Sequence, residues 1–143
     1  MIQRIQSIFL FLGAVLCFVL FFTDVADTPA PMETSSLFAD AQFTLFDDPI
    51  LLVLFGLAGV LLLVNIFLFN NRKLQMTLSL VAILLVVLGA GYGAFRFFTD
   101  VAAGSATPDF GLILPLLAII FGWLARNNIK KDEKLVRSAD RLR

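Results

Sequence analysis

The sequence contains no histidine and only one cysteine, Cys17. Histidine is the commonest general base near neutral pH and the commonest metal ligand. A single cysteine excludes both an internal disulfide and a thiolate metal cluster. No glycine-rich phosphate loop precedes a helix either. We therefore expect no cofactor, no metal and no enzymatic activity.

Charged residues are also scarce: they make up 15% of the 143 residues, whereas hydrophobic residues make up 59%. A soluble domain usually carries about 25% charged and 45–50% apolar residues. A chain of this length cannot cover a soluble core with so little polar surface. Its net charge is zero, which gives no reason to expect nucleic-acid binding. The composition predicts a small integral membrane protein in contact with the lipid bilayer.

Charged residues divide the chain into four uncharged runs of 19, 23, 22 and 16 residues. A transmembrane helix needs about 20 apolar residues. The fourth run is short, but a thinned bilayer or snorkelling flanks would still let it span. The first run could be a signal peptide, but no small-residue cleavage site directly follows Phe22, so we expect it to remain as a helix. The prediction is a single domain over residues 1–143, with helices at about 5–23, 49–69, 76–96 and 110–125.

Basic residues predict how this domain sits in the membrane. Ten of the eleven Lys and Arg residues lie in the N-terminus, the second connection or the tail at 126–143, and only Arg96 lies on the other side. The positive-inside rule then places both termini in the cytoplasm. The loops at 24–48 and 97–109 would then lie outside. The expected fold is an all-α, antiparallel bundle of four transmembrane helices.

The long first loop carries three local signals. Pro29 and Pro31 stop a helix, and the alternation in AQFTLF favours a small β-hairpin or one strand within residues 32–46. A plain loop whose aromatic residues enter the membrane interface remains an alternative. Asp47 and Asp48 precede Pro49, a pattern that predicts an N-cap and first-turn role.

A short sequence recurs where two of the predicted helices reach the outer side. FFTDVA occurs at 21–26 and again at 97–102. The recurrence fits either a duplicated helical hairpin or convergence on similar helix ends. Arg96 directly precedes the second copy, and we expect it to form an ion pair with Asp100 of that copy, at i, i+4 spacing.

Small and polar residues inside the spans indicate helix packing. Gly56 and Gly59 lie in the second predicted helix, and Gly89 and Gly93 form a GxxxG pair in the third. Glycine lets helix backbones approach closely in a bilayer. We favour packing within the bundle, with a homodimer or a partner helix as the alternative. Asn65 is expected to bond across helices or to reach lipid headgroups.

The tail at 126–143 has helical periodicity and predicts a short amphipathic helix. One stripe is basic and consists of Lys130, Lys134, Arg137 and Arg141. The other stripe is apolar and consists of Leu135, Val136, Ala139 and Leu142. Three interpretations remain open: binding to an anionic inner leaflet, docking on a protein partner, or a solvated topological anchor.

Three segments carry a resemblance to a known family: MIQRIQSIFLFLGAV at 1–15, IFLFNNRKLQ at 66–75, and LPLLAIIFGWLARNNIKKDEKLVRSADRLR at 114–143. In these segments the chain resembles the domain-of-unknown-function 4293 family of small four-helix bacterial membrane proteins. The resemblance implies four inner-membrane helices. It implies no activity and no catalytic residue.

Taken together, these features favour an uncharacterised structural, accessory or assembly subunit of a larger membrane complex, with other membrane subunits as partners. The alternative is a small homo-oligomeric transporter or a lipid-binding membrane protein. A transporter normally needs a carboxylate at mid-membrane depth, and the sequence offers none there.

Overall fold

The computed structural model describes the backbone of residues 2–140 and the side chains of residues 5–138. The chain is mostly helical, and its long helices are α1 (Ile2–Val19), α2 (Pro49–Phe67), α3 (Arg72–Thr99) and α4 (Leu114–Asp140). Three short 3₁₀ segments flank them: η1 (Leu20–Phe22), η2 (Leu45–Asp47) and η3 (Phe110–Ile113). All four helical segments are long and apolar enough to cross a membrane.

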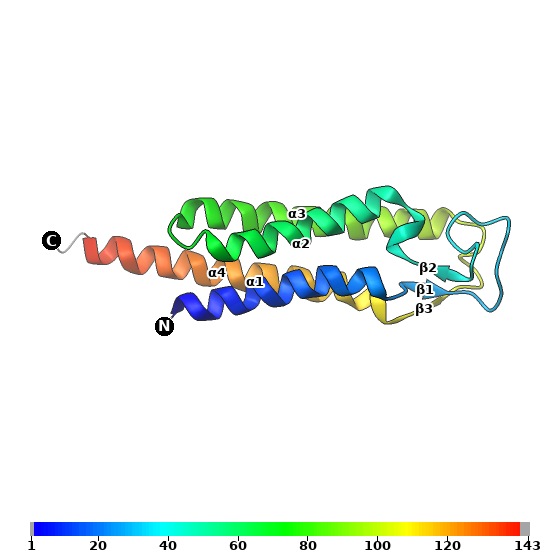
Figure 1. The fold of residues 1–143 in the computed structure, drawn as a ribbon, viewed down its shortest axis with the longest axis horizontal. Helices are drawn as coiled ribbons and strands as arrows, with labels where there is room; N and C mark the ends of the chain where they lie inside the picture. Colours follow the sequence, from blue (N-terminus) through cyan, green and yellow to red (C-terminus); the bar gives the residue numbers. More distant parts are fainter. Residues whose placement is uncertain (1, 141–143) are drawn as a thin grey trace.

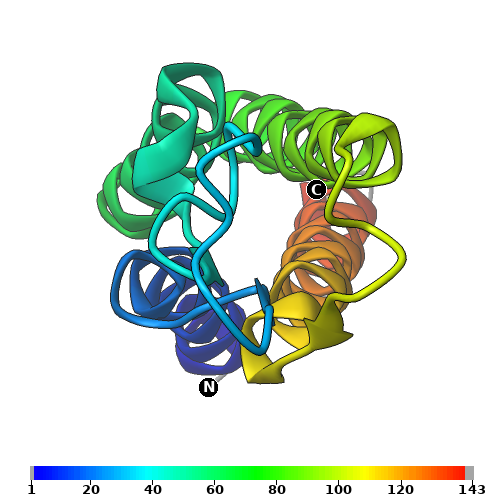
Figure 2. The same ribbon diagram turned by 90° about the vertical axis from the view of Figure 1, so that its right-hand side faces the viewer.

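The four helices lie side by side, and consecutive helices run in opposite directions (Figure 1). Viewed along its long axis, the molecule places α1 beside α2 and α4, with α3 completing the ring (Figure 2). We call the end that carries both termini and the α2–α3 turn the terminal end. The opposite end, formed by residues 23–48 and 100–113, is the loop end.

Helix ends follow local capping signals. The side chain of Asp48 accepts a hydrogen bond from the Ile50 backbone N–H at 2.9 Å, with Pro49 in the first turn of α2, which confirms the predicted N-cap. Asn71 accepts from the Leu74 backbone N–H at 3.1 Å and starts α3 four residues before the predicted position. Helix α4 runs without a break from Leu114 to Asp140 and so contains most of the tail that was predicted as a short amphipathic helix.

The loop end is held together by a three-stranded sheet of very short strands, in the order β2-β1-β3. These are β1 (Ala26–Asp27), β2 (Gln42–Phe43) and β3 (Thr107–Pro108). Ala26 lies opposite both Phe43 and Pro108, and both pairings are antiparallel. Within residues 32–46 only β2 is a strand, and its partner β1 lies outside that range. The sheet therefore joins the two loops, which are far apart in the sequence.

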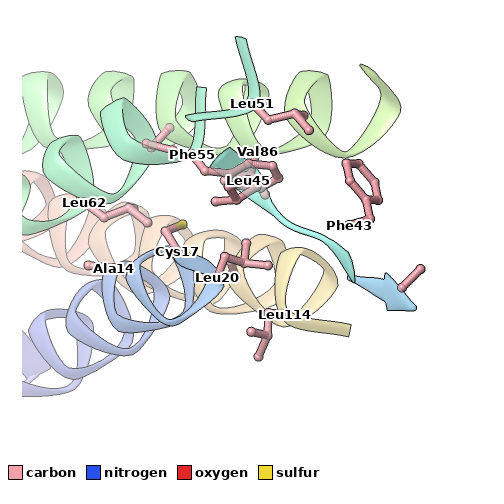
Figure 3. Close-up of a cluster of buried hydrophobic side chains, with 14 of the residues drawn as sticks. Ala14, Cys17, Leu20, Phe43, Leu45, Leu51, Phe55, Leu62, Val86 and Leu114 are labelled. Atoms are coloured by element: carbon pink, nitrogen blue, oxygen red, sulfur yellow. The ribbon is translucent and has the colours of Figure 1, made fainter. Parts of the chain in front are cut away.

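The apolar core follows the helical period. Buried residues recur three or four positions apart along α1 and α2, as at Leu10, Ala14 and Cys17 and at Leu51, Phe55, Ala58 and Leu62. Several of these side chains gather between the helices in Figure 3. The core continues into the loop end, where Leu37, Phe38, Phe43 and Leu45 are at most 2% exposed. The loops thus form a packed cap on the bundle.

Candidate functional site

The glycines predicted to pack helices lie against large side chains. A Cβ atom placed on Gly59 would be 3.0 Å from the Phe18 ring, and one on Gly56 would be 3.4 Å from the Phe21 ring. These two positions let α2 lie close to the end of α1. In α3, a Cβ on Gly89 would be 2.9 Å from the Phe55 ring.

Two glycines outside the predicted set lie where α1 and α4 approach each other. A Cβ on Gly13 of α1 would lie 3.7 Å from the Ala118 carbonyl oxygen and 3.8 Å from the Gly122 nitrogen of α4. Each is a lone glycine within an apolar helix, so no GxxxG spacing in the sequence indicated that these two glycines pack helices. The contact between α1 and α4 consequently brings the two backbones close at these glycines, beside side-chain contacts such as the stacked rings of Phe9 and Phe121.

The small residues of α3 border a cavity of about 570 Å³ in the half of the bundle near the loop end. Its volume falls within the range of about 300–1,000 Å³ that is usual for ligand sites. The residues that line it are all apolar. The buried wall includes Leu20, Phe43, Leu45, Leu51, Phe55 and Gly89. Figure 3 shows five of these side chains, all except Gly89.

The cavity opens on the side of the bundle, between α3 and the start of α4. Its exposed lining residues are Ala94 and Phe98 on α3, Leu112 and Leu116 on η3 and α4, and Pro108 of β3 at the edge toward the loop end. Phe98 is 77% exposed and Leu116 is 59% exposed. At the loop end, Ala26 and Phe43 of the sheet also line the space, and each is 2% exposed. The cap therefore covers the cavity on the side of the loop end, and the mouth is bordered by exposed apolar side chains.

Such a volume is costly if it remains unfilled. An unfilled volume deprives the side chains that line it of dispersion contacts, and this space measures about 570 Å³. The cavity is thus a site that favours an apolar occupant.

A polar clasp at the loop end holds α2, α3 and the first loop together. The Asp48 carboxylate lies 3.0 Å from the Arg96 Nε and accepts a hydrogen bond from the Tyr92 hydroxyl at 3.0 Å. Arg96 also donates to the Ser36 hydroxyl at 3.3 Å. The Asp48 side chain is only 7% exposed and that of Arg96 is 32% exposed. Asp48 is thus an N-cap whose second oxygen anchors the end of α3.

The predicted ion pair between Arg96 and Asp100 is wrong. Arg96 lies against Asp48, and Asp100 instead accepts from the Ser35 hydroxyl at 2.8 Å and from the Ala102 backbone N–H at 2.9 Å. Partial burial acts to raise the pKa of Asp100, but these hydrogen bonds outweigh it and lower the pKa below the ordinary value. Asp100 begins the turn after α3, so its carboxylate binds the turn and the first loop rather than the preceding helix face.

Three carboxylates meet at the junction of β1, β3 and η3. Asp24, Asp27 and Asp109 each place one oxygen within 4.8 Å of the others. Burial, followed by the charges of Asp27 and Asp109, raises the pKa of Asp24. Carboxylate oxygens of this kind are ligands that hard cations prefer. Asp109 is far from Asp24 and Asp27 in the sequence, and only the pairing of β1 with β3 brings it next to the first loop.

A buried polar layer lies near the terminal end. Asn65 donates to the Gln75 carbonyl at 3.0 Å and to the Ser79 hydroxyl at 2.8 Å, while Gln75 donates back to the Asn65 carbonyl at 3.0 Å. These three residues and Gln6 of α1 are at most 1% exposed. The prediction that Asn65 bonds across helices is confirmed. The sequence did not predict that Gln6 and Gln75 belong to this layer. Each lies close to a charged helix end, where a polar residue is common and does not indicate a buried hydrogen bond.

Amide oxygens in this layer have no hydrogen-bond partner among the described residues: Gln6 Oε1, Asn65 Oδ1 and Gln75 Oε1. Buried acceptors normally bind a donor, and water is the commonest one. The layer is therefore suited to hold water between α1, α2 and α3.

The last part of α4 extends beyond the other three helices (Figure 1). Arg72, the first residue of α3, pairs with Asp132 at 3.1 Å, so the following residues pass the end of the bundle. Lys130, Lys134 and Arg137 are exposed, as are Leu135 (54%) and Val136 (39%). Arg137 pairs with Glu133 at 2.9 Å. Arg141 and Leu142, also predicted for these stripes, lie outside the described residues.

Comparison with curated proteins and with solved structures gives no match. A model of a protein family does match, over residues 2–142. The match covers nearly the whole chain, including the loops in which the sequence analysis found no resemblance. The chain, with its four apolar helices, its cap and its extended α4, therefore belongs to the domain-of-unknown-function family DUF4293.

Proposed function

We propose that this protein is a non-enzymatic structural or accessory subunit of a larger assembly in a bacterial cytoplasmic membrane. The observation that carries the proposal is the extension of α4 past the bundle. Crossing a membrane needs about 20 residues, whereas α4 has 27. The additional turns present side chains outside the bundle.

These turns combine exposed apolar and basic groups. Leu135 and Val136 are exposed next to Lys134 and Arg137, and no other element covers them in the described part of the chain. A helix with an apolar stripe and flanking charges is a common way to dock into a hydrophobic groove of a partner. This favours docking on a protein partner as the role of the apolar stripe, one of the three interpretations that the sequence left open.

The distribution of charge supports an orientation with both termini in the cytoplasm. The terminal end carries Arg72, Lys73 and the bases of α4, whereas the loop end carries no Lys or Arg and Arg96 lies next to it, in the last turn of α3. Lys and Arg are enriched in cytoplasmic loops. The cap would then face the outside.

The orientation is tested with reporter fusions. We expect a fluorescent protein fused after Arg143 to fluoresce, and alkaline phosphatase inserted in the first loop after Pro31 to be active. The reverse pattern, with an active phosphatase at the C-terminus, would contradict the proposed orientation.

Charge placement supports a non-catalytic role. No charged residue occurs between Asp48 and Arg72 or between Lys73 and Arg96. Three of the four charges that bound these runs are engaged, in the pairs of Asp48 with Arg96 and of Arg72 with Asp132. A transporter, the alternative class, would need ionisable groups deeper in the bundle.

The subunit role predicts a bound partner. We expect the chain, tagged at its N-terminus and purified at native level in mild detergent, to retain an unlike membrane protein in stoichiometric amount. Replacing both apolar residues, as Leu135→Ser with Val136→Ser, should release that protein, because the stripe would lose its apolar contact area. Mass spectrometry of the retained chains is the measurement.

The matched control is Val101→Ser, which changes an equally apolar and 74% exposed residue at the loop end. It should leave the partner bound. Recovery of the chain alone, as a monomer or homo-oligomer, would contradict the proposed role. Retention of the partner by the double variant would contradict docking through α4.

A further inference from the structure

We propose that the cavity between α2, α3 and α4 binds one acyl chain of a membrane phospholipid, which enters sideways from the bilayer between α3 and α4. This inference rests on the cavity and does not depend on the proposed subunit role. The family match assigns no ligand to this region.

The chemistry of the wall selects a hydrocarbon. Every residue that lines the cavity is apolar, from Leu45 and Phe55 in the interior to Leu112 at the rim. A water molecule needs two to four polar partners to remain in a cavity, and this lining offers no polar side chain. A chain of methylene groups meets no unsatisfied polar atom there.

The position of the mouth decides which molecules reach it. The rim residues Phe98 and Leu116 lie in helical segments that are apolar enough to cross a membrane. The mouth therefore faces hydrocarbon. On the side toward water, the sheet residues Ala26 and Phe43 are 2% exposed and cover the cavity, while the apolar Pro108 of β3 forms the exposed edge of the mouth. Bilayer lipids are the apolar molecules that meet the mouth directly.

The shape of the cavity determines whether the acyl chain remains bound. An acyl chain that leaves the bilayer gains no hydrophobic free energy, because lipid tails are as apolar as the wall. Its gain comes from dispersion contacts with side chains such as Phe55 and Phe97 and from filling an unfilled volume. Binding should therefore be lost when a side chain of the protein occupies the same space.

The headgroup contributes little charge pairing. Arg96 is the one Lys or Arg within residues 94–125, the stretch that forms the rim and the adjoining loop. Its Nε already lies 3.0 Å from the Asp48 carboxylate, so an anionic headgroup finds no unpaired cation in this stretch next to the mouth. We expect phosphatidylcholine and phosphatidylglycerol with the same acyl chains to bind alike.

Quenching of a single tryptophan by brominated lipid tests the proposal. Trp123→Phe removes the native tryptophan, and Phe55→Trp then places a new one in the cavity wall, at a position that is 3% exposed. In liposomes of phosphatidylcholine brominated at mid-chain, we expect strong quenching, because a bromine atom would contact the indole. Leu62→Trp, at a position that is 1% exposed and outside the cavity, should be quenched severalfold less.

A plug variant separates the cavity from general lipid contact. Ala90→Phe adds a ring to the lining of the cavity and should abolish most of the quenching of Trp at position 55. Leu84→Phe adds the same ring to an exposed position of α3 that does not line the cavity, and should leave the quenching unchanged. Equal quenching at positions 55 and 62, or no effect of the plug, would overturn the proposal.

The wild-type chain provides a second measurement if the tryptophan variant fails to fold. With phosphatidylcholine that carries a photoreactive diazirine on its acyl chain, we expect labelled peptides to include buried wall residues such as Leu45 and Phe55. Labelling confined to outward positions such as Val60 and Val64 would overturn the proposal. So would a second copy of the chain cross-linked over the mouth, or binding restricted to phosphatidylglycerol.

Discussion

Replacing Asp48 with alanine is expected to lower the free energy of unfolding by about 3 kcal/mol, the lower end of the range for removing one partner of a buried ion pair. The substitution leaves Arg96 without its carboxylate and Tyr92 without its acceptor, and it removes the N-cap of α2. Arg96 is partly exposed, so water relieves part of the loss. Titration of SDS into mixed micelles, followed by near-UV circular dichroism, measures the effect.

Two related variants separate the contributions. Asp48→Asn keeps an acceptor oxygen for the Ile50 N–H but removes the charge and replaces the oxygen that accepts from Tyr92 with an NH2 donor. Because the N-cap of α2 remains, its loss should be smaller than that of Asp48→Ala. Asp40→Ala removes an exposed carboxylate of the same loop and should change stability by less than about 0.5 kcal/mol. A loss at Asp48 no larger than that at Asp40 would show that the clasp does not stabilise the bundle.

Gly111→Ala is the second substitution with a large expected effect. A methyl group at Gly111 would overlap the backbone carbonyl oxygen of Asp24, which accepts the Gly111 N–H at 3.0 Å. A backbone atom cannot move aside as a flexible side chain can, so β1 and η3 must separate. Overpacking of this kind typically costs about 1–3 kcal/mol and occasionally more, and we expect the upper end. Faster chymotryptic cleavage of the first loop and a lower midpoint of unfolding are the measurements.

Gly91→Ala is the matched control, because a Cβ at Gly91 meets nothing within 4 Å. In the interior of α3, alanine should stabilise the helix by about 0.5–1 kcal/mol relative to glycine. If both variants had the same effect, the close approach of Gly111 to Asp24 would not be the reason for the loss at Gly111.

The sequence by itself determined the features that depend on neighbouring residues. The spacing of charges located the four apolar helices, because a bilayer excludes charge from its interior. Asp48 before Pro49 predicted the start of α2, and Asn65 predicted a bond between helices. The periodicity at 130–137 predicted a helix, which α4 contains. Each of these depends on a few residues close together in the chain.

Only the tertiary structure decided which distant groups meet. Arg96 has an acid four residues away at Asp100, yet it pairs with Asp48, because the rotation of α3 in the bundle turns it toward α2. Asp24, Asp27 and Asp109 come together through strand pairing that two-residue strands do not reveal in the sequence. The cavity arises because small residues of α3 face the cap and the start of α4. Its volume depends on how three helices and two loops pack, a property that no single segment carries.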